Sequence, residues 1–231
     1  MADKTKIDWC DATINPVIGC GRGCEYCYAR KMNDRWKWVE DFSVPQFFPK
    51  ALEQPCKWKR PRIIFVCSMG ELWDPLVPDA WIFKTFAMID ENPQHEFLLL
   101  TKRAHDAHVW FPVLPDNARI GVSITSEADA CNRFDYYTDG QWCSEERNFI
   151  SFEPLLGPTS EAIYSRISWI IIGAQTNPNK QPEKDWVDEI LDVADEWGIP
   201  VLMKHNLVWP ADERRFEFPP ELERIRNGKY G

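Results

Sequence analysis

The sequence contains no apolar run close to the ~20 residues that a membrane-spanning helix requires, and this absence excludes a protein that crosses the membrane on helices. Its first residues, Met1-Ala2-Asp3-Lys4-Thr5-Lys6, also lack the apolar segment of a secretory signal. We therefore expect a cytoplasmic protein with no membrane partner. Eight cysteines in that compartment indicate cofactor chemistry in place of disulfide bridges.

Positive charge is scarce overall, because 27 Lys and Arg face 36 Asp and Glu and leave a net charge of −9. The scarcity is uneven along the chain. Residues 1–62 carry twelve basic and eight acidic side chains (+4), whereas the remainder carries fifteen and twenty-eight (−13). We interpret the acidic majority as a solvated outer face. The basic part surrounds a cysteine-rich loop and favours an anionic substrate such as a nucleotide or nucleic acid.

Short apolar segments alternate with helical patterns through most of the chain. Strands are expected to begin near residues 63, 97, 119, 149, 169 and 200, after an earlier short strand at 17–19. Helices are expected at about 28–38, 79–90, 104–111, 127–137 and 184–197. This alternation predicts βαβ units and a parallel sheet. Six or seven units are fewer than the eight of a full barrel, so we predict an open, partial TIM-like (β/α) barrel with helices outside. A doubly wound sheet is the alternative that periodicity leaves open.

The length of 231 residues suits one domain with a small appendage. We expect the barrel, including the cysteine loop, to occupy 1–208. Residues 209–231, with Pro210, Pro219 and Pro220 among many charges, are expected to form a cap or tail.

The densest chemical feature is Cys20-Gly21-Arg22-Gly23-Cys24-Glu25-Tyr26-Cys27, which places three cysteines within eight residues. Its two glycines allow the loop to curl the thiols inward, and so tight a group of thiolates requires a cation between them. Structural zinc takes four protein ligands, whereas an iron–sulfur cubane held by three cysteines keeps one iron open.

Other interpretations of the three cysteines remain. A zinc site could take Cys10, Cys56 or Cys67 as its fourth ligand. A disulfide loop would need an oxidising compartment, and buried thiols can also cluster by chance.

The spacing of three and then two residues between the cysteines, with an aromatic Tyr26 before the last, resembles the radical S-adenosylmethionine (SAM) superfamily. The resemblance implies a [4Fe-4S] cluster held by Cys20, Cys24 and Cys27, with the amino and carboxylate groups of SAM on the fourth iron. One electron from a flavodoxin- or ferredoxin-like donor would cleave SAM to methionine and a 5′-deoxyadenosyl radical, which abstracts a hydrogen atom from the substrate.

Nearly the whole chain is similar to a family of phage-associated, radical-SAM-like proteins that is distantly similar to spore photoproduct lyase. The motifs that carry this resemblance are Ile7-Asp8-Trp9, Asp11-Ala12-Thr13, Asn15-Pro16-Val17, Gly19-Cys20, Gly23-Cys24, Cys27-Tyr28-Ala29, Pro61-Arg62-Ile63-Ile64-Phe65-Val66, Ser68-Met69, Leu100-Thr101-Lys102-Arg103, Gly121-Val122-Ser123, Phe152-Glu153-Pro154-Leu155-Leu156-Gly157-Pro158 and Trp186-Val187. Cys10 stands where relatives often have Thr, and His205 where they often have Gln. By this resemblance Tyr26 would lie against the adenine of SAM, Gly70-Glu71 would meet its amino group, and Ser123 and Glu153 would contact its ribose or carboxylate.

Polar residues follow every apolar strand, at the edge where the active sites of parallel α/β sheets gather. Four of them are candidates for catalysis, namely Lys102, Glu153, Lys204 and His205. Each also has a structural interpretation, because Glu153 precedes a proline, the lysines could be surface side chains, and the histidine could belong to a loop. The candidates for phosphate contact are Lys57, Lys59, Arg60, Lys102 and Arg103, the first three interleaved with Trp58.

Together these features predict a radical SAM enzyme, of lyase or isomerase type, that acts on a nucleobase or nucleotide-linked substrate. Rearrangement of a modified thymine in phage DNA is one version, with the protein made by a phage in its host's cytoplasm or by a bacterium. Two alternatives remain. One is radical SAM chemistry on a peptide or small metabolite, which the acidic overall charge suits, and the other is a non-catalytic iron–sulfur or zinc binding module.

Overall fold

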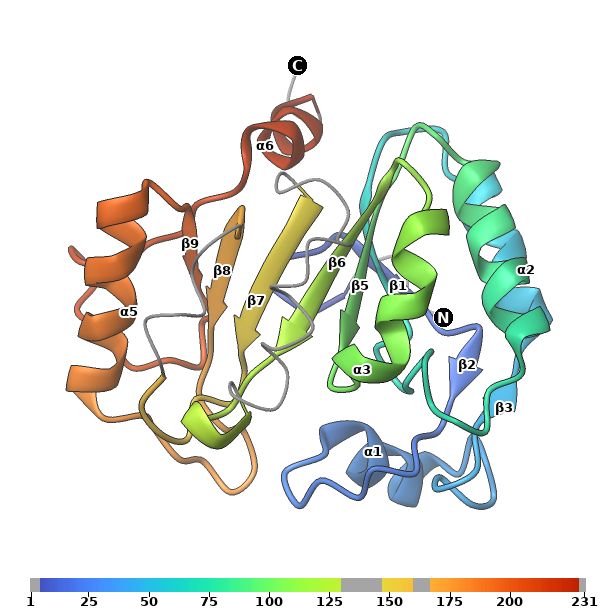
Figure 1. Ribbon diagram of the computed structural model, residues 1–231, viewed down its shortest axis with the longest axis horizontal. Helices are drawn as coiled ribbons and strands as arrows, with labels where there is room; N and C mark the ends of the chain where they lie inside the picture. Colours follow the sequence, from blue (N-terminus) through green and yellow to red (C-terminus); the bar gives the residue numbers. More distant parts are fainter. Residues whose placement is uncertain (1–4, 130–146, 160–166, 229–231) are drawn as a thin grey trace.

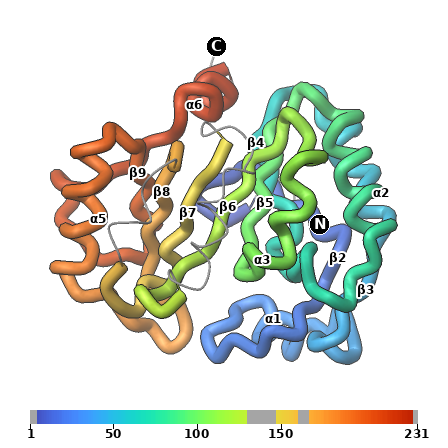
Figure 2. The backbone as a smooth tube through the Cα atoms, in the orientation of Figure 1, coloured from blue at the N-terminus to red at the C-terminus, as the bar shows by residue number. Residues whose placement is uncertain are grey.

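The structure is a computed structural model that describes residues 5–129, 147–159 and 167–228 (Figure 1). Within these residues seven parallel strands form one sheet, in the order β1 (Ala12–Ile14), β4 (Ile63–Val66), β5 (Glu96–Thr101), β6 (Ala118–Ser123), β7 (Asn148–Phe152), β8 (Trp169–Ile172) and β9 (Val201–Met203). The sheet curls into a half-barrel with helices around it (Figures 1 and 2), so the predicted open, partial barrel is confirmed.

Strand order in the sheet is the same as strand order in the chain, so successive crossovers turn the same way and put their helices on the outer face. On that face α2 (Asp79–Asp90) buries Ile82, Phe86 and Ile89. On the same outer face, at the other end of the sheet, α5 (Lys184–Trp197) buries Val187 and Ile190. Between them lie the short α3 (Ala104–Ala107) and the 3-10 helix η3 (His108–Val113).

Large aromatic side chains fill the inner face of the sheet near its amino edge. Trp169 is fully buried, with its ring centroid 5.9 Å from that of Phe149 and 5.1 Å from that of Phe218. Gly121 makes room for this packing, since a Cβ atom there would lie 2.3 Å from the Phe149 ring. Leu222 of α6 (Pro220–Asn227) joins the same cluster. The amino edge is therefore closed by packed rings and by the last helix (Figure 1).

The segment expected to form a cap, 209–231, contributes to this closure. Its Phe216 forms an antiparallel bridge with Leu202 of β9, and the Met203 N–H donates to the Arg215 carbonyl over 3.0 Å. The described part of the tail thus adds backbone hydrogen bonds to the last strand. Across the described residues, no helix has the length and apolar character that crossing a membrane would require.

The structure differs from the sequence-based expectations mainly before residue 60. The strand expected at 17–19 is β2 (Val17–Ile18), which pairs antiparallel with β3 (Gln46–Phe47) outside the main sheet. The first strand of the main sheet is β1, because Ala12 aligns with Ile64 of β4. The same region contains α1 (Tyr28–Trp36) and the 3-10 helices η1 (Pro49–Glu53) and η2 (Pro55–Lys57). Most of the helix expected at 127–137 lies outside the described residues.

Candidate functional site

The cysteine loop, residues 20–27, is anchored at the carboxyl edge of the sheet. Gly19 and Gly70 form a parallel β-bridge, and the Gly19 N–H donates to the Met69 carbonyl over 3.1 Å. A Cβ atom at Gly70 would lie 2.7 Å from the Val17 carbonyl oxygen, so this close approach of two backbones requires glycine. The loop is therefore tied to the turn that follows β4, where sheets of this kind collect their functional side chains.

The three thiols of the loop are partly exposed, and two of them accept backbone hydrogen bonds. Cys27 caps the amino end of α1, where its Sγ accepts from the Arg30 N–H over 3.4 Å. The Sγ of Cys20 accepts from the Arg22 N–H over 3.4 Å. Hydrogen bonds to sulfur stabilise the thiolate form and tune iron–sulfur clusters.

Burial, together with the smaller effects of the neighbouring carboxylates of Glu71 and Asp74, raises the pKa of the Cys20 thiol to about 11, and the hydrogen bond from the Arg22 N–H opposes this rise. With no cation beside it, this thiol is protonated at neutral pH. A bound metal reverses that preference, because a coordinating thiol is deprotonated. The loop therefore favours a cationic centre over free thiolates.

The donor set fits an iron–sulfur cluster better than a zinc ion. No three His, Cys, Asp or Glu side chains among residues 5–129, 147–159 and 167–228 converge on one metal position, so the fit rests on three thiols in one short loop and their N–H partners. For a fourth zinc ligand, Cys56 lies in η2, ahead of β4 and so at the other edge. Cys67 packs in the hydrophobic cluster of Ile14 and Val66, and Cys10 packs against the cluster of Trp9 and Phe65, whereas Cys20 and Cys27 pack against a third cluster.

Glu71 is buried and binds the chain around it. Its Oε1 accepts from the Thr101 hydroxyl over 2.8 Å and its Oε2 from the Lys102 N–H over 3.1 Å. Burial raises the pKa of this carboxyl, and the two hydrogen bonds oppose that rise. Contact between Gly70-Glu71 and the amino group of SAM stays a prediction. The observed contacts give Glu71 a positioning role, since they join the carboxyl ends of β4 and β5 and orient Lys102.

Four of the predicted site residues form a continuous row along the carboxyl edge. The Lys102 Nζ donates to the Ser123 Oγ over 2.6 Å, and the Ser123 Oγ donates to the Glu153 carbonyl over 3.2 Å. The Glu153 carboxylate forms an ion pair with the Nζ of Lys204. We call these residues, which come from the ends of β5, β6, β7 and β9, the Lys–Ser–Glu–Lys row.

Gly173, at the end of β8, leaves space for the last pair of this row. A Cβ atom at Gly173 would lie 3.0 Å from the Lys204 Cδ and 3.2 Å from the Glu153 Cγ. Both approaches are closer than ordinary van der Waals contact, so a larger residue would displace the ion pair.

The cysteine loop reaches the row through Lys102. The Lys102 Nζ lies 5.9 Å from the centre of the Tyr26 ring, a cation–π distance. The Arg22 guanidinium donates to the Lys102 carbonyl over 2.7 Å. The three predicted ligands and the predicted adenine contact therefore lie on a loop that touches the row directly.

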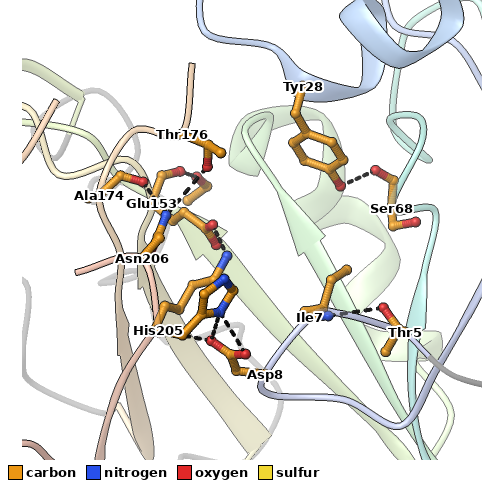
Figure 3. Close-up of polar contacts among 12 residues, drawn as sticks. Thr5, Ile7, Asp8, Tyr28, Ser68, Glu153, Ala174, Thr176, His205 and Asn206 are labelled. Atoms are coloured by element: carbon orange, nitrogen blue, oxygen red, sulfur yellow. Dashed lines mark hydrogen bonds and ion pairs between the residues drawn. The ribbon is translucent and has the colours of Figure 1, made fainter. Parts of the chain in front are cut away.

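Sequence analysis missed Asp8, the partner of His205. The His205 Nδ1 lies 2.7 Å from the Asp8 Oδ2, and the His205 N–H donates to the same oxygen over 2.8 Å (Figure 3). Asp8 precedes β1 and His205 follows β9, so the contact joins the first and last strands of the open barrel. The Ile7-Asp8-Trp9 motif was the available signal, but no pattern in the sequence pairs residues 197 apart.

Tyr28 is the second side chain at this edge that sequence analysis missed. It is the first residue of α1, and its hydroxyl donates to the Ser68 carbonyl after β4 (Figure 3). Tyr28 follows Cys27 directly, so the start of α1 belongs to the same edge as the loop.

The structure does not bring the predicted phosphate contacts together. Lys57, Lys59 and Arg60 precede β4, whereas the cysteine loop lies beyond its carboxyl end. The four residues of β4 separate the two groups by about 13 Å along the strand. Arg103 does lie at the carboxyl edge, but it forms ion pairs with Asp106 at 3.2 Å and Asp74 at 3.7 Å. Net charge along the sequence could not show on which edge each cation falls.

Comparison with known proteins identifies a family for this chain. No curated protein and no solved structure matches the chain. A family model described as "Protein of unknown function (DUF5131)" matches residues 4–229, nearly the whole length of the chain. The protein with this cysteine loop and this Lys–Ser–Glu–Lys row therefore belongs to the DUF5131 family.

Proposed function

We propose that this protein is a radical SAM enzyme that acts on a nucleobase or nucleotide-linked substrate. The observation that carries the proposal is the position of the cysteine loop. A three-cysteine loop with N–H···S hydrogen bonds lies at the carboxyl edge of an open parallel half-barrel and contacts a row of charged side chains. A [4Fe-4S] cluster held by Cys20, Cys24 and Cys27 would supply the electron that cleaves SAM to methionine and a 5′-deoxyadenosyl radical.

The Lys–Ser–Glu–Lys row suits the recognition of SAM beside that loop. The Lys102 ammonium, whose Nζ lies 2.6 Å from the Ser123 Oγ, carries three N–H donors and can donate to a carboxylate. The Glu153 carboxylate, held by Lys204, offers acceptors to a ribose hydroxyl or an ammonium group. Tyr26 supplies a ring for stacking against adenine. These contacts would orient the bound SAM.

The compartment and the electron donor follow from the same proposal. The cluster requires a reducing environment, so we infer that the protein works in the cytoplasm with a flavodoxin- or ferredoxin-like donor. The substrate half of the proposal rests on the resemblance to spore photoproduct lyase and on the two cations at the loop, Arg22 and Lys102.

Reductive cleavage of SAM tests the proposal. Anaerobically reconstituted protein, reduced with dithionite, should form 5′-deoxyadenosine, measured by chromatography. Cys24→Ala should lower this rate at least about 100-fold, because even residues that only support a metal ligand change activity by 10–100-fold. Cys56→Ala is the matched control, since it removes an exposed thiol at the other edge of the sheet. Equal rates in the two variants would contradict the proposal.

A further inference from the structure

One side of α1 is unusual because large aromatic and apolar side chains on it are extensively exposed. Tyr28, Met32 and Trp36 are 48%, 41% and 59% exposed, and Trp38 just beyond the helix is 42% exposed. Residues four apart lie on one side of an α-helix, so the first three form a stripe along α1. Exposed apolar patches of this kind commonly mark binding sites.

Positive charge accompanies this stripe. Residues 28–38 contain Arg30, Lys31, Arg35 and Lys37 against one acid, Asp34, a balance of +3 in a chain of net charge −9. At 3.6 residues per turn, Lys31 and Arg35 share a sector of about 140° with the apolar stripe. The Arg35 guanidinium lies 5.0 Å from the centre of the Trp36 ring. We name Tyr28, Lys31, Met32, Arg35, Trp36 and Trp38 together the α1 face.

Hydrogen bonds define the path of the backbone at the end of the helix, where the two indoles are attached. The Lys37 N–H donates to the Asn33 carbonyl over 2.7 Å, with Lys37 in the left-handed region at φ 51°. The buried Asn33 side chain exchanges two hydrogen bonds with the backbone of Val39, at 2.9 and 3.0 Å. A preorganised surface loses less conformational entropy on binding.

The α1 face leads directly from the candidate site. Its first residue, Tyr28, follows Cys27, and its hydroxyl contacts the Ser68 carbonyl at the end of β4. Lys31 extends toward the other side of the site, where its Nζ donates to the Asn177 carbonyl after β8 over 2.5 Å. In Figure 1, α1 lies beyond the carboxyl ends of the strands, away from α6.

Helix α5 provides an internal contrast. It also ends in a tryptophan that is 59% exposed, Trp197. Residues 184–197 contain one lysine and six acids, a balance of −5. An exposed indole therefore occurs on both helices, whereas the combination with cations occurs on α1.

We propose that the α1 face binds a single-stranded segment of nucleic acid. Its indoles would stack on bases, and Lys31 and Arg35 would contact phosphates, as in other proteins that bind single strands. A base at the end of this segment would then reach the carboxyl edge next to Tyr28. The inference rests on the proposed function for its substrate class. It assigns the predicted phosphate contacts to α1 in place of residues 57–60.

Fluorescence anisotropy with a labelled oligothymidylate of about 16 nucleotides tests this inference, since single-strand sites are no longer than this per module. Trp36→Ala should weaken binding about tenfold, because base stacking on an aromatic ring typically contributes this much. Trp36→Phe, which keeps a ring, should retain most of the affinity. Trp197→Ala, equally exposed on acidic α5, is the matched control and should bind like the unmodified protein.

The salt dependence of oligonucleotide binding tests the proposed phosphate contacts separately. Arg35→Gln should reduce the slope of log affinity against log salt by about 0.7, the change expected for one lost phosphate contact with a single strand. The same sequence as a duplex should bind more weakly, because its bases are not free to stack on the indoles.

Two results would overturn the inference. The first is no oligonucleotide binding, or equal affinity in Trp36→Ala and Trp197→Ala. The second is a Trp36→Ala variant that binds DNA normally and cleaves SAM at the unmodified rate with dithionite, but more slowly than the unmodified protein with reduced flavodoxin. That result would assign the α1 face to binding of the electron donor. SAM cleavage separates this outcome from failure of the proposed function. Normal SAM cleavage together with oligonucleotide binding that does not depend on Trp36 would contradict the inference alone. Binding that depends on Trp36, without SAM cleavage, would contradict the proposed function alone.

Discussion

The two edges of the parallel sheet differ in what their polar groups contact. At the amino edge the buried Arg119 pairs with Glu96 at 3.6 Å and Glu221 of α6 at 3.2 Å, and the Trp169 Nε1 donates to the Glu217 carbonyl over 2.9 Å. These contacts join strands to the last helix and close the half-barrel. The carboxyl edge carries the partly exposed thiols of the cysteine loop and the Lys–Ser–Glu–Lys row. The difference indicates that the amino edge stabilises the fold, whereas the candidate site lies at the carboxyl edge.

The largest effect on stability is expected at the amino edge. Trp169→Ala should lower the free energy of unfolding by about 3–5 kcal/mol, because it empties a fully buried site among Phe149 and Phe218. Urea unfolding followed by circular dichroism measures this loss. Cys24→Ala, at the carboxyl edge, should change stability of the metal-free protein by less than about 1 kcal/mol. Similar losses of stability in the two variants would contradict the conclusion that the two edges differ in their contribution to stability.

A smaller effect concerns one carboxyl at each edge. Burial raises the pKa values of Glu71 and Glu96 above the ordinary value of 4.5. The folded protein therefore binds more protons than the unfolded chain just above pH 4.5, and its stability should fall as pH rises through that window. Glu71→Gln and Glu96→Gln should each flatten this part of the profile, measured by urea unfolding at a series of pH values. A profile unchanged in both variants would show that neither carboxyl titrates in this window.

The smallest effect is expected where the first and last strands meet. Asp8→Asn removes the charge that faces His205, whose side chain is 70% exposed. The loss should be about 0.2–1 kcal/mol, the range of exposed ion pairs, measured by the same urea unfolding. Lys184→Gln, which breaks the exposed pair with Asp188 on α5, is the control. A loss as large as that of Trp169→Ala would mean that this contact, and not the aromatic core, holds the half-barrel together.

Most of the fold was predictable because the main strands are largely apolar and buried. Ile63–Val66 and Trp169–Ile172 are buried throughout, and α2 and α5 begin and end where their apolar spacing indicates. The first strand was misplaced because Ala12–Ile14 is only three residues long and is defined by its pairing with β4. Local propensity carries no information about that partner.

The candidate site was predictable in part for the same reason. Strand ends identified Lys102, Ser123, Glu153 and Lys204, which the structure brings into one row. The sequence could not reveal that Asp8 meets His205, or that Lys57, Lys59 and Arg60 precede β4 at the other edge. Both facts depend on how the sheet curls and on the direction of its strands. A count of charges along the chain gives no information about either.

The most direct test of the proposed iron–sulfur site is an electron paramagnetic resonance spectrum of anaerobically purified, dithionite-reduced protein, recorded with and without SAM. The account predicts the signal of a reduced cluster that changes when SAM is added, because SAM would contact an iron left open by three cysteines. Protein that contains stoichiometric zinc and shows no iron signal would contradict it and would indicate a metal-stabilised binding protein.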